Sequence, residues 1–392
     1  MTKYNFDEVI DRSGTGAIKT DVLDERYGNK DLIPLWVADM DFKSPPAISE
    51  AIIERTKHGI FGYTRPSQEY YDSIKNWVAR HHDWKIEQEW LSYIPGIVKG
   101  IAFVVDCFTT KEDKVIIQPP VYHPFRIIPT YHHREVVDNA LILDTGRYYM
   151  DIELLKKQVN PSTKLLILCN PHNPAGRVWT RQELIDIADI CYDNNVLVIS
   201  DEIHADLAFE GHQHIPFASV SDKAAQNSIT FMAPSKTFNI AGIVSSYSIV
   251  PNEKIRERFY AYLESSELQD GHIFAYVATE AAYNHGDEWL TEAKEYIREN
   301  INFVDKYLKE KIPQIKTMIP DASFLVWLDC RELNLSQPEL EDLFVKDAKL
   351  ALNSGTMFGA GGEGFMRMNV GCPKIILEKA LDQLKRAITS KC

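Results

Sequence analysis

Short apolar runs alternate with amphipathic helical stretches between residues 93 and 232, and this alternation restricts the fold more than any other feature of the chain. Thr180, followed by Glu183 three residues later, predicts the capped start of a helix that continues to about residue 193. Strands that alternate with helices form a mostly parallel sheet with helices on both faces. We therefore expect an α/β fold, with strands at residues 115–118, 165–169, 196–200 and 229–232.

Each of the four predicted strands is followed by residues that can carry chemistry. Ligands of open α/β sheets bind outside the carboxyl ends of the strands. Because parallel strands end at the same edge, the segments that follow them are expected to form one site. These segments are residues 119–122, 170–176, 201–204 and 233–236.

The last of these segments places Lys236 beside Ser235, among small and apolar residues. A lysine that is removed from water loses part of the hydration of its charged form, so its pKa falls and the free amine can react with an aldehyde. The hydroxyl of Ser235 suits a phosphate oxygen. An isolated Ser-Lys pair is more often a surface turn, so this hypothesis depends on the residues at the other strand ends.

Pyridoxal phosphate is an aldehyde cofactor that uses a lysine, a phosphate seat and an acidic partner. Asp201 can pair with its pyridine nitrogen, although an aspartate in this position could equally cap a helix. Asn173 can donate to the phenolate oxygen, and His204 can support the ring from beside Asp201. Tyr122 can stack on the ring face. These residues together predict a pyridoxal-phosphate site.

A phosphate seat is predicted at Gly96, Ile97 and Val98, which begin an expected helix. The free backbone N–H groups at the start of a helix bind anions. A simple turn is the alternative at this position.

Arg367 lies in an otherwise apolar strand predicted at residues 365–370. Its guanidinium fits an amino acid's α-carboxylate, and a structural ion pair is the alternative. The preceding glycine-rich segment, residues 359–364, formally matches a dinucleotide-binding fingerprint. We reject that match because the glycines precede a strand instead of leading from a strand into a helix.

Two segments near the N-terminus carry polar residues of interest. Residues 33–42 form an extended apolar run that contains Asp39 and Asp41. Two carboxylates cannot both be buried there cheaply, and one interpretation is a strand at the edge of the core with both aspartates in solvent. After a helix predicted over residues 46–59, residues 61–66 form an exposed loop that carries Tyr63.

The formal net charge of -13, without clusters of Lys and Arg, argues against nucleic acid as a partner. No run approaches the ~18 apolar residues of a membrane span, and the first twelve residues lack an apolar signal segment. We therefore expect a cytoplasmic protein that does not contact membranes. The six cysteines are far apart and the adjacent histidines do not share a helix face, so no metal site is expected.

Taken together, these segments resemble the fold-type I pyridoxal-phosphate enzymes of aminotransferase class I/II, and within them the PatB/MalY-type cystathionine β-lyases. The resemblance covers nearly the whole chain. It implies a large domain, with a mostly parallel seven-stranded sheet covered by helices, and a smaller α/β domain. The segments that carry it are residues 36–42, 61–64, 170–174, 200–204, 235–239 and 366–369.

The resemblance also implies how the chain is divided. Residues 1–45 would form an N-terminal arm and part of the small domain, residues 46–285 the large cofactor-binding domain, and residues 286–392 the small C-terminal domain. A helix is expected to join the two domains.

Specific roles follow from the resemblance. Lys236 bonds to the cofactor, Asp201 meets the pyridine nitrogen and Asn173 meets the phenolate. The resemblance implies a homodimer in which Tyr63 reaches the neighbouring subunit's site and is expected to contribute to cofactor binding, substrate binding and catalysis. Tyr122 is also expected to act in catalysis beside Lys236. The substrate's partners are Arg367, Ala38, Asn173 and Tyr63.

Two residues depart from the wider aminotransferase pattern. His204 stands where many members carry a tyrosine that bonds the phenolate, and Val244 stands where they carry a phosphate-binding arginine. Phosphate binding is therefore expected to depend more on backbone amides, Ser235 and Tyr63.

The implied reaction is α,β-elimination of cystathionine or another S-substituted cysteine to a thiol, pyruvate and ammonia. An aminotransferase shares the same carbanion chemistry and is one alternative. A binding or regulatory protein that uses this fold without turnover is another.

Overall fold

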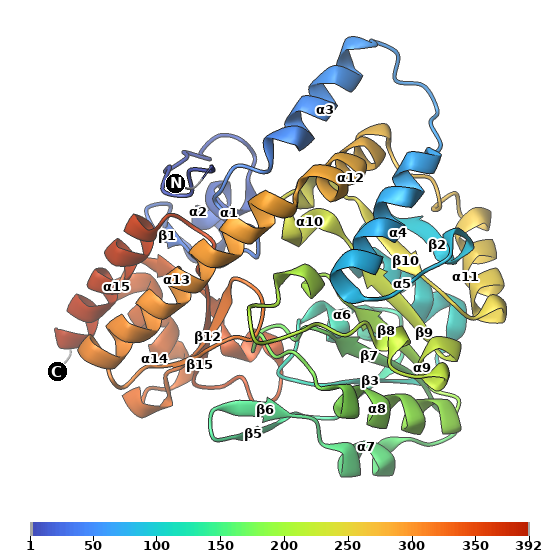
Figure 1. The fold of residues 1–392 in the computed structure, drawn as a ribbon. Coiled ribbons are helices and arrows are strands. Elements are labelled where there is room, and N and C mark those ends of the chain that lie inside the picture. Colours follow the sequence, from blue (N-terminus) through green and yellow to red (C-terminus); the bar gives the residue numbers. More distant parts are fainter. Residues whose placement is uncertain (1–2, 391–392) are drawn as a thin grey trace.

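The computed structural model describes residues 3–390 and contains a seven-stranded sheet between layers of helices (Figure 1). The strand order is β2-β10-β9-β8-β7-β3-β4. The strands from β9 to β4 run parallel, and β10 runs antiparallel to both of its neighbours. The prediction of an α/β fold with a mostly parallel seven-stranded sheet is confirmed. The strands are β2 Leu91–Ile94, β3 Lys114–Ile117, β4 Glu135–Asp138, β7 Thr163–Cys169, β8 Leu197–Asp201, β9 Ser228–Met232 and β10 Ser246–Ile249.

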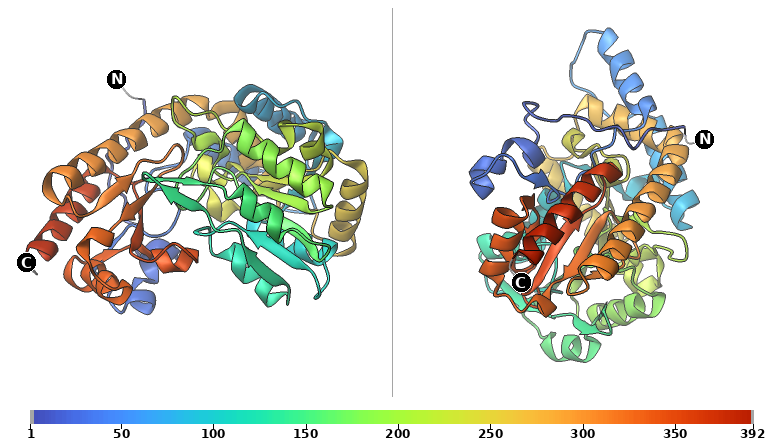
Figure 2. Two further views of the ribbon diagram at one scale, coloured as in Figure 1. Left: turned by 90° about the horizontal axis from the view of Figure 1, so that it is seen from below. Right: turned by 90° about the vertical axis from the view of Figure 1, so that its left-hand side faces the viewer.

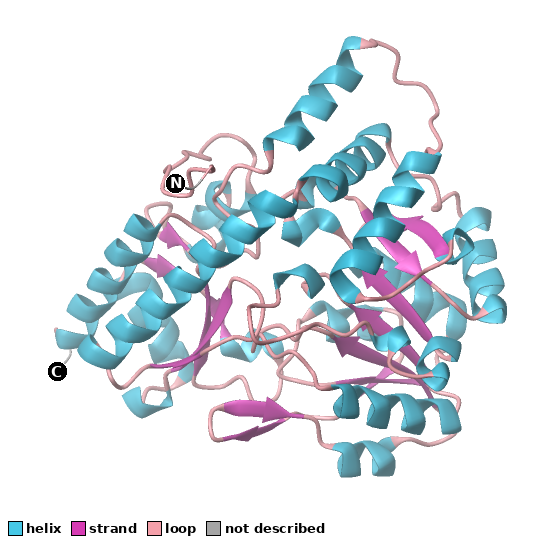
Figure 3. Cartoon of the chain, in the orientation of Figure 1, coloured by secondary structure: helices cyan, strands magenta, loops and turns pink. Residues whose placement is uncertain are grey.

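Helices bury both faces of this sheet, which explains why its strands are apolar throughout. In β7, Leu165 and Ile167 pack against α5, α6 and α11, whereas Leu166 and Leu168 pack against α7, α8 and α9. Figure 3 shows the helices on both sides of the strands. The helices are α5 Ile97–Phe108, α6 Pro124–Tyr131, α7 Ile152–Gln158, α8 Arg181–Asp193, α9 Asp222–Gln226 and α11 Glu253–Ser265.

The start of α8 has the predicted cap. The Thr180 side chain accepts from the Glu183 N–H, and the Glu183 carboxylate accepts from the Thr180 N–H. Each side chain therefore satisfies a backbone donor that the helix cannot.

Helix α5 lies very close to the sheet because it carries Gly100. A Cβ at this position would lie 2.8 Å from Cγ2 of Ile94 and 3.0 Å from the Phe231 ring. The first turn of α5 follows Gly96, whose φ of +102° is one that residues with a side chain rarely adopt. The close contact holds the N-terminus of α5 beside the ends of the neighbouring strands.

A second sheet, of four strands in the order β11-β12-β15-β14, lies at the other end of the molecule (Figure 2). It packs against α13 Asp287–Lys311 and α15 Lys374–Thr389. The helix α13 leads directly from the large-sheet region into this smaller one (Figure 1). The proposed division at residues 45 and 285 stays a prediction. The strands are β11 Lys316–Met318, β12 Leu325–Asp329, β14 Asn353–Ser354 and β15 Phe365–Asn369.

The N-terminal segment returns to the C-terminal part of the chain. Strand β1 Ile33–Pro34 pairs in parallel with β13 Leu350–Ala351. The short helices α1 Ile18–Asp21 and α2 Leu23–Tyr27 precede it. Next, α3 Pro46–Lys57 packs along α12 Ile273–His285 and leads through an extended loop into α4 Gln68–His82 (Figure 1).

The remaining elements include a hairpin and two short helices. The hairpin joins β5 Ile142–Asp144 to β6 Arg147–Tyr149, α14 spans Gln337–Asp342, and the reactive lysine lies in α10 Pro234–Thr237. Within residues 3–390 no helix has the length and apolar character that crossing a bilayer requires.

Candidate active site

A cavity of about 370 Å³ opens at the carboxyl ends of β7, β8 and β9, beside the N-terminus of α5. Its size suits a cofactor-sized ligand. It brings together residues from all four segments that follow the predicted strands. The predicted residues that line it are Ala38, Gly96, Ile97, Val98, Tyr122, Asn173, Asp201, His204, Ser235 and Lys236.

Lys236 projects from α10, and its Nζ donates to the backbone carbonyl of Ala38 at 2.7 Å. Burial is the largest influence on its pKa and lowers it. Arg367 lowers this pKa further, while Asp39 and Asp201 raise it. The lowered pKa favours the uncharged amine, which is the form that reacts with an aldehyde.

Asp201 ends β8 with only 5% of its surface exposed. Its carboxylate accepts from the Ile203 N–H at 3.1 Å. Burial raises its pKa to about 7. The helix-cap alternative is wrong, because His204 and not Asp201 is the N-cap of the next helical turn, Ala205–Leu207. A buried carboxylate with a raised pKa is suited to a cationic ring nitrogen.

Arg367, on β15, lies behind Asn173 and is 5% exposed. It donates to the side-chain oxygens of Asn173 (2.9 Å) and Asn353 (2.6 Å) and to the Trp36 carbonyl (3.0 Å). These partners are neutral, so the ion-pair alternative is wrong among the described residues. Without a carboxylate nearby, burial lowers its pKa to about 10.

The contact between Arg367 and Asn173 orients both side chains. Since the Asn173 oxygen accepts from Arg367, its amide nitrogen is left to donate toward the cavity. The Nε of Arg367 is buried and has no hydrogen-bond partner within residues 3–390. A buried donor without an acceptor is costly, and a ligand carboxylate would remove that cost.

The phosphate seat contains no arginine. Val244 lines the cavity in a left-handed conformation, with φ at +56°, and lies beside Gly96. Ser235 is buried and lines the cavity next to Lys236. Lys99 also lines the cavity and was missed in the sequence, although its place in the first turn of α5 was a usable signal.

His204 and Tyr122 complete the apolar wall. His204 is 3% exposed, and its Nδ1 has no hydrogen-bond partner among the described residues. Burial, followed by the charges of Lys236 and Arg367, lowers its pKa to about 3, so this imidazole is neutral. Burial raises the pKa of Tyr122, which therefore keeps its proton at neutral pH.

The segment from Trp36 to Phe42 corrects one interpretation of the sequence. Strand β1 ends at Pro34, and the rest of the run is irregular. Asp39 and Asp41 are only partly exposed, and Arg12 and Lys19 bind both of them. Arg12 and Lys19 carry no local signal in the sequence, since they lie in a stretch without periodic pattern.

Arg367 does not line the cavity itself but binds Asn173 in its wall. Tyr63 does not line the cavity either. It is fully exposed on the loop between α3 and α4. Its role in a partner's site stays a prediction.

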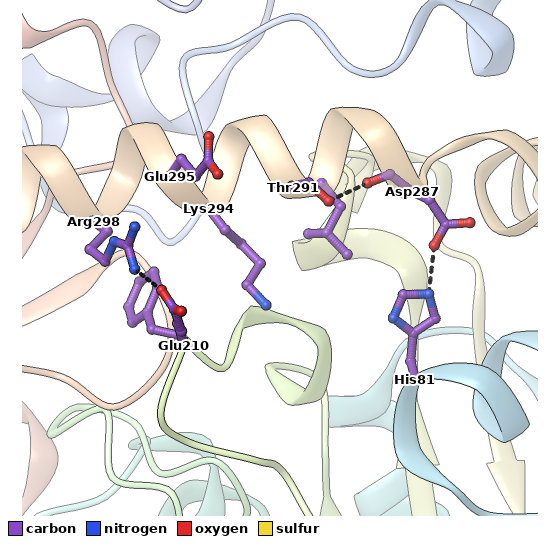
Figure 4. Close-up of a pocket in the computed structure, with 9 residues that line it drawn as sticks. His81, Glu210, Asp287, Thr291, Lys294, Glu295 and Arg298 are labelled. Atoms are coloured by element: carbon purple, nitrogen blue, oxygen red, sulfur yellow. Dashed lines mark hydrogen bonds and ion pairs between the residues drawn. The ribbon is translucent and has the colours of Figure 1, made fainter.

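Figure 4 shows another cavity, along α13 and next to His81 of α4. Asp287 accepts from His81 at 2.7 Å, and Arg298 donates to Glu210 at 2.9 Å. This cavity shares no lining residue with the cavity around Lys236. Because most of its charged groups satisfy one another, we place the chemistry at Lys236. Within residues 3–390 no group of His, Cys, Asp or Glu side chains could hold a metal ion.

The family model for aminotransferase class I and II matches residues 30–384 of this chain. The chain belongs to this family. Cystathionine beta-lyase PatB of Bacillus subtilis is 44% identical over 98% of this chain and 100% of its own length. Protein MalY of Escherichia coli is 32% identical over 98% and 99%. The crystal structure of cystalysin from Treponema denticola, which contains a pyridoxal 5'-phosphate cofactor, has a TM-score of 0.96 at 34% identity and covers 99% and 100%.

The cavity fits the cofactor seen in that member of the aminotransferase class I and II family. A lysine with a lowered pKa, a buried carboxylate with a raised pKa and the free N–H groups of α5 are the groups that a pyridoxal phosphate requires.

In the cofactor-free protein, Asp201→Asn is expected to increase the free energy of unfolding at pH 8 more than at pH 5. The folded-state pKa of Asp201 is about 7 against an ordinary 3.8. Between pH 3.8 and about 7, Asp201 keeps its proton in the folded protein but has lost it in the unfolded chain. The free energy of unfolding of the wild type therefore falls as pH rises through this range. From pH 5 to the folded-state pKa of about 7, a span of about 2 pH units, the change in the free energy of unfolding is about 3 kcal/mol.

Urea unfolding of both proteins at the two pH values measures this gap. Asp193→Asn, at an exposed surface carboxylate, is the control and should show no pH-dependent gain. If wild type and Asp201→Asn differed in free energy of unfolding by the same amount at both pH values, burial would not raise the pKa of Asp201 as described.

Proposed function

We propose that this protein is a pyridoxal-phosphate-dependent carbon-sulfur β-lyase that cleaves cystathionine or another S-substituted cysteine to a thiol, pyruvate and ammonia. One observation carries the proposal: Lys236 and Asp201 line one cavity, and Arg367 binds Asn173 in its wall, in a chain that is 44% identical to cystathionine beta-lyase PatB over almost its whole length. Cavity geometry alone suits an aminotransferase equally well, because both reactions begin with loss of the α-proton. The relatives favour the lyase.

The cavity residues would hold the cofactor at both ends. Lys236 would bond to it, Asp201 would pair with the ring nitrogen, and the Asn173 amide would donate to the phenolate oxygen. The N–H groups at the start of α5 and the Ser235 hydroxyl would bind the phosphate. When bound, pyridoxal phosphate accepts the electrons that the substrate's α-carbon keeps when its proton leaves.

The substrate's α-carboxylate would bind to Arg367. Two observations support this: Asn173 and Asn353 hold the guanidinium in place, and its Nε has no partner. A guanidinium that is already held in place loses little conformational entropy when a carboxylate binds to it. The Ala38 carbonyl lies at the same side of the cavity as Lys236 and would contact the substrate's amino end.

Lys236 would move the protons. Its lowered pKa favours the uncharged amine, which is the form that can take the α-proton. The resulting ammonium, or the hydroxyl of Tyr122 or Tyr63, would then protonate the departing thiolate. The high pKa of Tyr122 makes it a donor and not a base at neutral pH.

We also propose a homodimer with shared sites. The loop that carries Tyr63 exposes Ile60 and Phe61 as well, and apolar side chains on a projecting loop are typical of a subunit contact. A cytoplasmic location is our further proposal. Unpaired thiols are typical of a reducing compartment, and the free ones are Cys107, Cys169, Cys191, Cys330 and Cys372.

Purified protein supplied with cystathionine and no keto acid is expected to release pyruvate continuously. Lys236→Ala should lower the rate by roughly 10²–10⁴-fold, because the proton carrier is lost. A coupled lactate dehydrogenase assay measures pyruvate. A single turnover that leaves the cofactor as the amine would favour the aminotransferase, and binding without any product would favour the regulatory protein.

Arg367→Lys is expected to lower kcat/KM for cystathionine roughly ten- to over a hundredfold, as the loss of charged hydrogen bonds worth about 1.5–3 kcal/mol would do. The matched control is an S-substituted cysteamine, which lacks the α-carboxylate and should react equally poorly with both enzymes. A lower melting temperature with an unchanged KM for cystathionine would show that Arg367 is structural.

Mixing Tyr63→Phe subunits with Lys236→Ala subunits is expected to restore activity that neither variant has alone. A heterodimer then holds one site in which both native residues meet, so random exchange should recover about a quarter of wild-type activity. Mass spectrometry of the intact dimers verifies the exchange. Proven heterodimers without any gain would mean that Tyr63 and Lys236 serve the same subunit.

A further inference from the structure

Four charged side chains form a cluster outside the cavity wall, and no step of the proposed reaction uses them. Arg12 binds Asp39 through both carboxylate oxygens, at 2.8 and 3.1 Å, and binds Asp41 at 2.8 Å. Lys19 Nζ lies 2.7 Å from Asp41 Oδ2 and 3.2 Å from the Asp39 carbonyl. Lys19 is completely buried. The cluster holds two positive and two negative charges and is balanced.

The cluster is attached to the segment Trp36–Phe42, which connects the two ends of the site. At one end of the segment the Trp36 carbonyl accepts from Arg367, and two residues later the Ala38 carbonyl accepts from Lys236. The position of this backbone therefore affects the position of both Lys236, the proposed proton carrier, and Arg367, the proposed partner of the substrate's carboxylate.

Two asparagines hold the segment on its remaining sides. Asn239, three residues after Lys236, pairs with the Met40 backbone through both its side-chain atoms. Asn369, two residues after Arg367, donates to the Val37 and Asp39 carbonyls. Lys19 meets the Asp39 carbonyl from a different element, α1. The Asp39 peptide is thus held between Asn369 and Lys19.

Charge connects the cluster to Lys236. The charged groups that act on the Lys236 amine are Asp39, Arg367 and Asp201. His204, which also faces it, is neutral. Of these three residues, Asp39 belongs to the charged cluster, where Arg12 and Lys19 offset its negative charge. A buried ion cluster adds little net stability over apolar packing, so stability is a weak explanation for a fully buried Lys19.

We propose that Lys19 is a positioning residue of the active site: it fixes the Asp39 peptide that places the Ala38 carbonyl at Lys236, and it offsets the negative charge that Lys236 meets. The inference rests on the proposed attachment of pyridoxal phosphate to Lys236. It predicts that a change of charge in the cluster alters the pH at which the nitrogen shared by Lys236 and the cofactor gains or loses its proton.

The test is a pH titration of the visible absorbance of the holoenzyme, which reports protonation of that nitrogen without any turnover. Lys19→Met leaves the cluster with one excess negative charge and should raise the midpoint by about half to one pH unit. Asp39→Asn leaves one excess positive charge and should lower the midpoint. The double variant keeps the balanced Arg12–Asp41 pair, and its midpoint should return close to that of wild type.

Lys43→Met is the matched control, because Lys43 pairs with Glu8 at 2.8 Å on the surface and is exposed. Its midpoint should not move. A merely structural role for Lys19 would loosen the segment in every variant and shift all midpoints in one direction. Shifts of the same sign for Lys19→Met and Asp39→Asn, or no shift in either, would overturn the proposal. If Lys19→Met does not fold, an unchanged midpoint in Asp39→Asn overturns it alone.

The wild-type titration separates this inference from the proposed function. Wild-type protein that takes up no cofactor would count against the function itself. Wild-type protein that shows the absorbance and titrates, while the variants titrate identically, would count against the positioning role alone.

Discussion

The burial of Asp201 at the end of β8 is the interaction on which the rest of the site depends. Burial raises its pKa to about 7, and the hydrogen bond from the Ile203 N–H is too little to stabilise its charged form. Such a carboxylate costs the fold free energy until a cation lies beside it. A protonated ring nitrogen is such a cation, so cofactor binding and fold stability are coupled through one residue.

The same exclusion of water lowers the pKa of the two basic side chains of the site. Burial lowers the pKa of Lys236, and it lowers that of Arg367 to about 10. In Lys236 this produces a reactive amine. Arg367 stays charged and, because neutral oxygens from Asn173, Asn353 and Trp36 fix it, its charge remains available to a ligand. One physical cause thus yields a base and an anion receptor, depending on how far each group's ordinary pKa lies above neutral pH.

Four distant parts of the chain surround these groups. Gly100 lets α5 approach the sheet, which puts its free N–H groups at the phosphate end. The segment Trp36–Phe42 contacts Lys236 on one side and Arg367 on the other. Asn239 and Asn369, close in sequence to these two residues, hold that segment in place. The N-terminal part of the chain is therefore a wall of the site and not an appendage to it.

The sequence by itself determined the large sheet, the capped helix α8 and the residues at the strand ends. Apolar periodicity and helix caps are local patterns, and parallel strands necessarily bring their carboxyl ends to one edge. Lys236, Asp201 and Asn173 could therefore be assigned to one site. Tertiary structure alone decided that Asp39 and Asp41 are bound by Arg12 and Lys19, and that Arg367 has neutral partners. The physical reason is that pairing between charges far apart in the chain leaves no periodic trace, since it depends on which irregular segments the folded core brings together.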